Sequence, residues 1–270
     1  MAEDGIAAID PARLGPPAGR RVAIVGGCGG IGRAVTRAAL ATGLRVAVLD
    51  LDRSLGDHPP PAGALAVALD ATDERRVEAA FAEVAKAFGG GLDGLVNLAG
   101  FANRHARFDE LSLAEWEATV AGSLRSTYLC CRAALPLLRA SPAEEGAAIV
   151  NTASGLAVRL LPGFAPYGAA KAGVIAFTKS IAVEMAPAVR ANVLAPGAVD
   201  TEFHTGGTGR PADTPNAAPR LDRDAYSRIV PLRRIAVAAD MVGPILFLLG
   251  PAARFLTGQV LHVNGGGLMP

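Results

Sequence analysis

The chain has 270 residues, which is enough for one large or two small domains and for a core that needs no disulfide bonds. Hydrophobic residues make up 51% and charged residues 19%, a composition that excludes disorder of the whole chain. With 26 basic and 25 acidic residues, no net charge favours binding to nucleic acid or to an anionic membrane. Any function must therefore come from a local site.

The first 19 residues contain prolines and glycines without a sustained hydrophobic period, which predicts a loose extension ahead of one domain over residues 20–270. The N-terminal residues lack the basic flank and apolar run of a secretory signal. The most apolar stretch, Met241–Leu249, is too short to span a membrane. Three cysteines form no disulfide or zinc pattern (Cys28, Cys130, Cys131). We expect a cytoplasmic protein with no bound metal and no membrane or nucleic-acid partner.

From Arg20 onward, short β-branched apolar runs alternate with segments of helical period. The predicted strands are Arg21–Gly26, Arg45–Leu49, Ala64–Leu69, Gly94–Leu98, Ala147–Thr152, Arg190–Leu194 and Gln259–Val263. The predicted helices are Gly30–Thr42, Asp73–Phe88, Leu113–Arg139, Tyr167–Met185 and Ala239–Leu249. This alternation predicts an α/β fold: a single Rossmann-like doubly wound domain with a seven-stranded, mostly parallel sheet and helices on both faces.

Three local patterns refine this outline. Thr72 is the expected N-cap of the helix that follows it. Segments 52–63 and 202–231 are rich in residues typical of loops, and the second is too long for an ordinary connection. The long segment therefore indicates a functional lid or a mobile loop.

A glycine-rich turn follows the first predicted strand and opens the first predicted helix. It runs from Val25 through Gly26-Gly27-Cys28-Gly29-Gly30-Ile31-Gly32. Glycines let a backbone approach a dinucleotide pyrophosphate, and the helix N-terminus supplies free N–H groups and a partial positive charge. Gly26, Gly30, Ile31 and Gly32 are therefore predicted cofactor contacts. The alternative is a flexible glycine-rich turn that binds no ligand.

Asp50 ends the next strand, 18 residues after Gly32. A carboxylate at this place accepts hydrogen bonds from the adenosine ribose hydroxyls and repels a 2′-phosphate, so it favours NAD over NADP. Asp52 is the alternative acid, and Arg33 and Arg53 are the cations nearest to a 2′-phosphate. Asp70, after the third predicted strand, is expected either to face the adenine or to cap the next helix.

Tyr167 and Lys171 are spaced four residues apart on a predicted helix, so they share one face. A phenol is a slow base at neutral pH, but a nearby ammonium and an oxidised nicotinamide both favour the phenolate. Ser154 follows a strand 13 residues before the tyrosine, where its hydroxyl could orient an alcohol or carbonyl oxygen. The alternative for Ser154 is an ordinary turn serine.

Several motifs occur in the order typical of one family. They are the glycine turn, Asn97-Leu98-Ala99-Gly100, Ser154, Tyr167-Gly168-Ala169-Ala170-Lys171, the segment Asn192 to Gly197, and Thr257-Gly258-Gln259 through Gly265-Gly266. From Arg21 to Met269, the chain resembles the short-chain dehydrogenase/reductase family.

This resemblance implies that Ser154, Tyr167 and Lys171 are catalytic and that Lys171, beside Tyr167, also holds the nicotinamide ribose. It also implies that Val199 and Thr201 meet the nicotinamide carboxamide. The remaining implied cofactor contacts are Asn97, Ala99, Gly100, Pro196 and Gly197. By the same resemblance the protein forms a homodimer or homotetramer through the helices predicted at 113–139 and 167–185.

The chain departs from the family pattern at several positions. Val25 stands where a threonine is usual, and Leu98 where a second asparagine is usual. The larger change is Ser123, which replaces a fourth catalytic residue, an asparagine whose backbone helps to hold a proton-relay water near the lysine. Ser123 is therefore the candidate for this relay. Ala170 and Asn264 replace a frequent serine and a frequent aspartate.

The histidines, two arginines and two aromatic residues do not indicate a further site. The four histidines, His58, His105, His204 and His262, have no metal-ligand spacing and are interpreted as surface or loop residues. Arg104, His105 and Arg107 could meet an acidic substrate, although a solvated loop explains them better. Phe108 and Trp116 are expected in the core or in an interface.

These residues together predict an NAD(H)-dependent oxidoreductase that interconverts a secondary alcohol and a ketone, with Tyr167 as general acid and base. An NADPH-dependent reductase of 3-oxoacyl thioesters is one alternative. A second is an NAD-binding sensor or assembly subunit with little turnover, for which Ser123 and Leu98 argue. A sugar-nucleotide epimerase or dehydratase is a third, but too few residues follow Asp200 for its substrate domain.

Overall fold

Alternate residues of the first strand, β1 (Arg21–Val25), face opposite sides of a buried sheet. Val22 and Ile24 belong to one hydrophobic core cluster, and Ala23 and Val25 belong to another. Both sets are almost fully buried, because the sheet carries helices on each face. The continuous apolar runs of the sequence are therefore strands covered on both sides.

The computed structural model describes residues 14–143, 146–208 and 221–270. Its main sheet has seven parallel strands in the order β3-β2-β1-β4-β5-β6-β9. The further strands are β2 (Arg45–Asp50), β3 (Leu65–Ala68), β4 (Gly94–Asn97), β5 (Ala147–Thr152), β6 (Val189–Pro196) and β9 (Val260–Val263). The predicted doubly wound α/β fold is confirmed.

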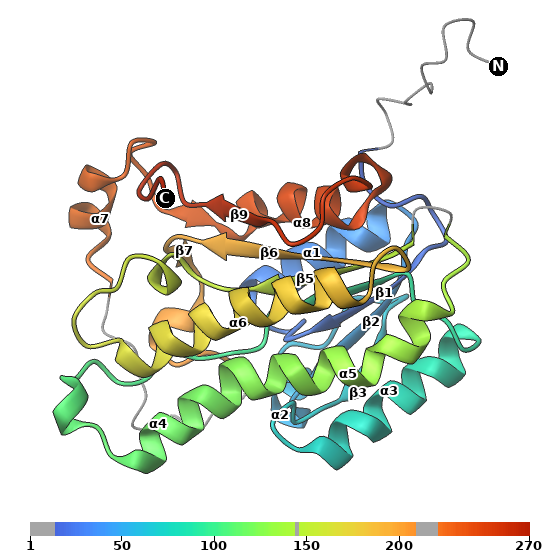
Figure 1. Cartoon of the computed structure of the whole chain (residues 1–270), viewed down its shortest axis with the longest axis horizontal. Coiled ribbons are helices and arrows are strands. Elements are labelled where there is room, and N and C mark those ends of the chain that lie inside the picture. The colour runs from blue at the N-terminus through green and yellow to red at the C-terminus, as the bar shows by residue number, and fades with distance from the viewer. Residues whose placement is uncertain (1–13, 144–145, 209–220) are drawn as a thin grey trace, which may run out of the picture.

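Helices cover both faces of this sheet (Figure 1). One face carries α3 (Glu74–Phe88), α4 (Leu113–Val120), α5 (Ser126–Arg139) and α6 (Ala165–Glu184). The other carries α1 (Gly30–Ala41) and α8 (Val242–Leu249), which supply Val35 and Ile245 to the second core cluster. Each apolar helix stripe is thus buried against one side of the strands.

Several predicted details need correction. The helix predicted over 113–139 contains a π-helical turn, Ala121–Arg125, between α4 and α5. The predicted N-cap Thr72 is wrong: Asp73 caps α3 by accepting hydrogen bonds from the N–H groups of Arg75 and Arg76, since its carboxylate is one residue closer to the helix. Elements that were not predicted are α2 (Asp52–Asp57), α7 (Arg223–Ile229) and a small parallel pair, β7 (Val199–Asp200) with β8 (Ala236–Val237).

The expected extension lies partly outside the described residues, which begin at Leu14. Residues 15–19 contact the domain, for Gly15 lies against Gly250 and Leu246, and the Gly19 N–H donates to the Gly43 carbonyl. In the segment predicted as a lid, residues 209–220 also lie outside the described part. Within the described ranges, no helix is both long and apolar enough to cross a bilayer, and no cluster of three potential ligands could hold a metal ion.

Candidate active site

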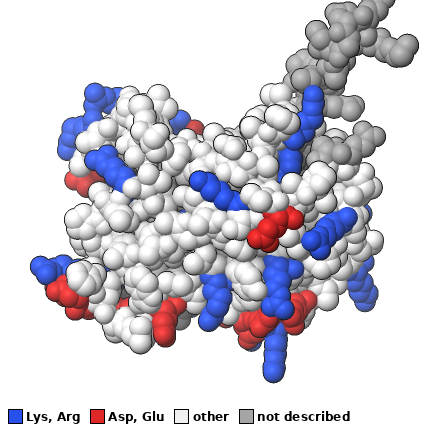
Figure 2. Space-filling view, in the orientation of Figure 1, with Lys and Arg blue, Asp and Glu red and all other residues white. Residues whose placement is uncertain are grey.

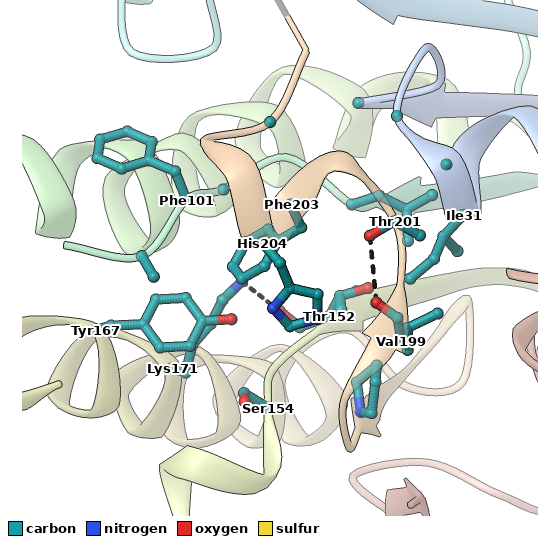
Figure 3. A pocket seen from close by; sticks show the side chains of 18 of the residues that line it. Ile31, Phe101, Thr152, Ser154, Tyr167, Lys171, Val199, Thr201, Phe203 and His204 are labelled. Atoms are coloured by element: carbon teal, nitrogen blue, oxygen red, sulfur yellow. Dashed lines mark hydrogen bonds between the residues drawn. The ribbon is translucent and has the colours of Figure 1, made fainter. Parts of the chain in front are cut away.

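A cavity of about 720 Å³ opens at the carboxyl ends of the parallel strands. The chain order of the strands reverses between β1 and β4, and ligands of doubly wound sheets bind at such a reversal. Six strands, β1 to β6, each place a residue from their carboxyl end, or from just after it, in the cavity wall: Gly26, Asp50, Asp70, Ala99, Ser154 and Gly197. Figure 3 shows a close view of this cavity.

The glycine turn forms one wall and fits a dinucleotide. Gly26 has a φ of +77°, and a Cβ atom there would lie 2.7 Å from the backbone nitrogen of Ala99. A Cβ atom on Gly32 would collide with the Gly26 carbonyl oxygen, so glycine is required at both positions. Gly29 caps α1 without a side chain, which leaves the first N–H groups of the helix available to a pyrophosphate.

Asp50 both organises this turn and lines the cavity. Its Oδ2 accepts a hydrogen bond from the Cys28 N–H, and its Oδ1 accepts one from the Leu51 N–H, each at 2.8 Å. The alternative acid, Asp52, is exposed on α2 and does not line the cavity. Asp50 is therefore the carboxylate that can reach an adenosine ribose.

The cations considered for a 2′-phosphate are engaged elsewhere. Arg33 donates to the Cys28 carbonyl and forms an ion pair with Glu202 at 2.5 Å. Arg53 is exposed and lies 3.6 Å from Asp57. Neither arginine is among the residues that line the cavity.

Asp70 reaches the cavity from the end of β3 while it holds a turn. Its Oδ1 accepts hydrogen bonds from the N–H group of Thr72 at 2.9 Å and from the Thr72 hydroxyl at 2.7 Å. Asp70 does not cap the next helix, α3, because Asp73 is its N-cap. Asp70 therefore stabilises the approach to α3 and leaves part of its carboxylate facing the cavity.

Ser154, Tyr167 and Lys171 meet at the other side of the cavity (Figure 3). Tyr167 and Lys171 are one turn apart on α6, and both are almost completely buried. The Lys171 Nζ donates to the Thr152 carbonyl at 2.8 Å and lies 5.7 Å from the centre of the Tyr167 ring. Ser154 begins a short 3-10 turn, where its Oγ accepts a hydrogen bond from the Leu156 N–H at 3.2 Å.

Burial is the main influence on the pKa values of Tyr167 and Lys171. It raises the pKa of Tyr167 to about 12, although a hydrogen bond with Ser154 acts in the opposite direction. It lowers the pKa of Lys171 to about 8. At neutral pH the Tyr167 phenol is thus protonated and the Lys171 side chain is mostly charged.

Two predicted site residues do not line the cavity: Asn97 and Ser123. The Asn97 side chain lies between the sheet and α5, where its Nδ2 donates to Asn151 Oδ1 at 2.7 Å and to Cys131 Sγ at 3.4 Å. Ser123 lies in the π-helical turn and donates from its Oγ to the Phe101 carbonyl at 3.3 Å. A Cβ atom on Gly100 would lie 3.2 Å from Lys171 Nζ and 3.3 Å from Ser123 Oγ, so these two atoms flank the same small space.

Known proteins resemble this chain in sequence. A family model described as "Enoyl-(Acyl carrier protein) reductase" matches residues 26–267. A cis-4-hydroxycyclohexanecarboxylate dehydrogenase from Sinomonas cyclohexanicum is 35% identical over 94% of this chain and 98% of that protein. A D-threitol dehydrogenase from Mycolicibacterium smegmatis is 34% identical over 92% of each chain. The chain belongs to the short-chain dehydrogenase/reductase family.

A solved structure agrees with this assignment. The 3-ketoacyl-(acyl-carrier-protein) reductase of Brucella melitensis, complexed with NADH, has a TM-score of 0.81 and 28% identity over 93% of this chain and 99% of that one. As a member of the short-chain dehydrogenase/reductase family, the protein is an oxidoreductase that acts on CH–OH and C=O groups. The family binds a nicotinamide cofactor.

This short-chain dehydrogenase/reductase also has cavity residues that the sequence did not indicate. Phe203 and His204 lie on a short 3-10 turn, η4 (Glu202–Thr205), and the Phe203 ring centre is 5.9 Å from that of Tyr167. Burial lowers the pKa of His204, although its ring hydrogen-bonds the Val199 backbone. His204 is thus a half-buried loop histidine that also lines the cavity. The only sequence feature that indicated a role for His204 was its position in the long segment 202–231, which was predicted to be a lid or a mobile loop.

Two arginines, one histidine and two aromatic residues considered from the sequence lie outside the cavity. Arg104 pairs with Glu115 and Arg107 with Asp109, outside the cavity. His262 is in strand β9 rather than in a loop. Phe108 and Trp116 are 76% and 42% exposed, so neither is a core residue of this chain.

Proposed function

We propose that the protein is an NAD(H)-dependent oxidoreductase that interconverts a secondary alcohol and a ketone. The buried Tyr167 phenol carries this proposal, because it shares one cavity with Ser154, with the Lys171 ammonium and with a glycine turn suited to a dinucleotide. A buried, protonated phenol is a suitable proton donor to a carbonyl oxygen. Relatives that act on a hydroxycyclohexane and on a tetritol support the alcohol and ketone class.

Each residue of the trio has a separate task in the proposed reaction. The Ser154 hydroxyl donates a hydrogen bond to the substrate oxygen and holds it in place. The Tyr167 hydroxyl gives its proton to the ketone oxygen during reduction and takes it back from the alcohol during oxidation. The Lys171 ammonium, held by the Thr152 carbonyl, places a positive charge beside the phenolate that remains.

The bound nicotinamide would supply the hydride in reduction and accept it in oxidation. In the proposal its dinucleotide is held by the first turn of α1 and by Asp50, with Asp70 at the adenine. Pro196, Gly197, Val199 and Thr201 line the same cavity beside the trio and are assigned to the nicotinamide end. Asp50 supports NAD over NADP, since its negative charge would lie next to a 2′-phosphate.

A reductase of 3-oxoacyl thioesters is the second candidate. The family model and a relative named 3-oxoacyl-[acyl-carrier-protein] reductase favour this substrate class. The presence of Ser154, Tyr167 and Lys171 in one cavity argues against the alternative of a cofactor-binding sensor with little turnover. The three free, buried cysteines support our further proposal of a cytoplasmic location, and the domain is proposed to extend over residues 20–270.

The test is a screen of secondary alcohols, ketones and 3-oxoacyl thioesters with NAD(H) and NADP(H), followed by absorbance of the reduced nicotinamide. We expect turnover of at least one alcohol and ketone pair, and Tyr167→Phe should remove nearly all of it because the proton donor is lost. NADH binding by the same variant serves as the folding control. Wild-type protein that binds NADH but turns over no compound would support the sensor instead.

A further inference from the structure

Arg159 lines the cavity but has no role in the proposed reaction. Arg159 is exposed to solvent and lines the cavity together with several apolar side chains, namely Leu156, Leu161, Phe164, Ile229 and Leu268. Among the described residues of the cavity wall, Arg159 and Lys171 are the only arginine and lysine, and the Lys171 ammonium is held by the Thr152 carbonyl. An exposed arginine beside apolar residues of a cavity is suited to bind an anionic group of a ligand that enters the cavity.

The backbone places Arg159 close to the reacting groups. Its N–H donates to the Gly155 carbonyl at 3.0 Å, so Arg159 is one helical turn beyond Gly155, the residue next to Ser154. Its guanidinium Nη1 donates to the Gly267 carbonyl at 3.4 Å, a long and weak hydrogen bond. This contact leans the side chain toward the C-terminal segment and leaves most of its N–H donors open to a ligand.

The carboxylates that line the cavity are used by other partners. Asp50 holds the glycine turn, Asp70 binds Thr72, and Asp222 caps α7 through the Ala225 N–H. Glu202 pairs with Arg33. In the part of the chain that the structure describes, Arg159 has no ion-pair partner, unlike Arg104 and Arg107, which pair with carboxylates outside the cavity.

We propose that Arg159 binds an anionic group of the substrate while Ser154 and Tyr167 bind its reacting oxygen. The inference rests on the proposed function and narrows its substrate class to ketones and alcohols that carry an anion. A planar guanidinium binds a carboxylate through two parallel hydrogen bonds, which would fix the substrate orientation. A carboxylate of a small oxo acid and a phosphate of a thioester carrier offer the same chemistry.

The experiment compares two ketones that differ only in charge, 4-oxocyclohexanecarboxylate and its carboxamide, with NADH. Arg159→Met should raise KM for the carboxylate at least tenfold, about 1.4 kcal/mol, and leave kcat and the carboxamide kinetics nearly unchanged. Arg159→Lys should restore part of the loss, because it keeps the charge without the planar fork. Arg75→Met is the matched control, since Arg75 is exposed on α3 and outside the cavity.

Acetoacetyl-CoA forms the second arm and distinguishes the source of the anion. A KM increase for this thioester alone would assign Arg159 to the carrier phosphate. Equal effects of Arg159→Met on the carboxylate and the carboxamide, or no effect on any anionic substrate, would overturn the inference while the proposed function stands.

If wild-type protein reduces none of the ketones, the proposed function fails, and the inference is tested by binding. Quenching of bound NADH fluorescence by 4-oxocyclohexanecarboxylate should then occur in wild type and be weakened at least tenfold in Arg159→Met. Equal quenching in both proteins, or none in wild type, would also overturn it.

Discussion

At the residue scale, Asp50 combines a structural and a binding role. Both of its carboxylate oxygens accept backbone N–H groups, from Cys28 in the glycine turn and from Leu51 at the end of β2. Each oxygen keeps a further lone pair for a ligand hydroxyl. The position of the charge is thus held by the same backbone that would surround the adenosine phosphates.

This arrangement predicts a cofactor preference. NADH should bind at least tenfold more tightly than NADPH, a difference of about 1.4 kcal/mol, because a 2′-phosphate would meet the Asp50 carboxylate in a partly desolvated place. Fluorescence titration of both cofactors measures it, and Asp50→Asn should narrow the difference by removing the charge. Equal affinities in wild type would contradict the role of Asp50 and direct attention to Arg33 or Arg53.

Ser123 permits a second prediction at this scale. Its Oγ and Lys171 Nζ flank the space beside Gly100, while its own carbonyl accepts a hydrogen bond from the Thr127 hydroxyl at 2.9 Å. If the hydroxyl relays the proton, Ser123→Ala should lose about ten- to a hundredfold in turnover with NADH affinity unchanged.

The matched variant is Ser123→Asn, which restores the residue usual in the family. Turnover of both variants should be compared with wild type under the same conditions. An alanine variant as active as wild type would show that the neighbouring backbone and a water, rather than the Ser123 hydroxyl, supply the relay.

At the scale of elements, η4 lies across the N-terminus of α1. A Cβ atom on Gly30 would be 2.9 Å from Thr201 Cβ and 3.2 Å from Glu202 Oε2. Burial raises the pKa of Glu202, but hydrogen bonds, chiefly from Arg33, outweigh burial and keep the pKa below its usual value. A charged carboxylate therefore lies beside the N–H groups that suit a pyrophosphate.

The expected consequence is a tighter cofactor complex when this charge is removed. Glu202→Gln should bind NADH several-fold more tightly than wild type at low salt, because one negative charge near the pyrophosphate is lost. Isothermal titration at two ionic strengths measures the effect, which should shrink as salt increases. Weaker binding by Glu202→Gln would indicate instead that the ion pair with Arg33 holds η4 in the form that accepts the cofactor.

At the scale of the whole molecule, large apolar side chains remain on the helical face that α4, α5 and α6 form. Val183 is 83% exposed and Tyr128 is 43% exposed, and Leu113 and Trp116 lie on the same set of helices. Figure 2 shows large parts of this face without charged side chains. Such a surface suits contact with a second copy of the chain.

Light scattering at micromolar concentration should therefore report a mass above the 27.4 kDa of one chain, as expected for a dimer or tetramer. Val183→Asp should shift the mass toward the monomer, because it places a charge in an apolar contact. A control, Arg75→Asp, introduces an acid on the outer helix α3. A wild-type monomer under these conditions would contradict the proposed assembly.

The sequence by itself determined the order of the strands along the chain and the glycine turn after the first strand. It also determined the position of Asp50 at the end of the second strand and the four-residue spacing of Tyr167 and Lys171. These features depend on local patterns: alternating apolar runs, backbone freedom at glycine, and the turn of one helix. The small sheet of β7 and β8 escaped prediction because two-residue strands have no period.

Only the tertiary structure decided which side chains enter the cavity. Asn97 belongs to the family motif, but its side chain bonds Asn151 and Cys131 between the sheet and α5, whereas Arg159 lines the cavity without any motif around it. Arg33 and Glu202 are 169 residues apart and meet because η4 packs over α1. Contacts of this kind arise from the packing of distant elements, which local sequence patterns do not encode.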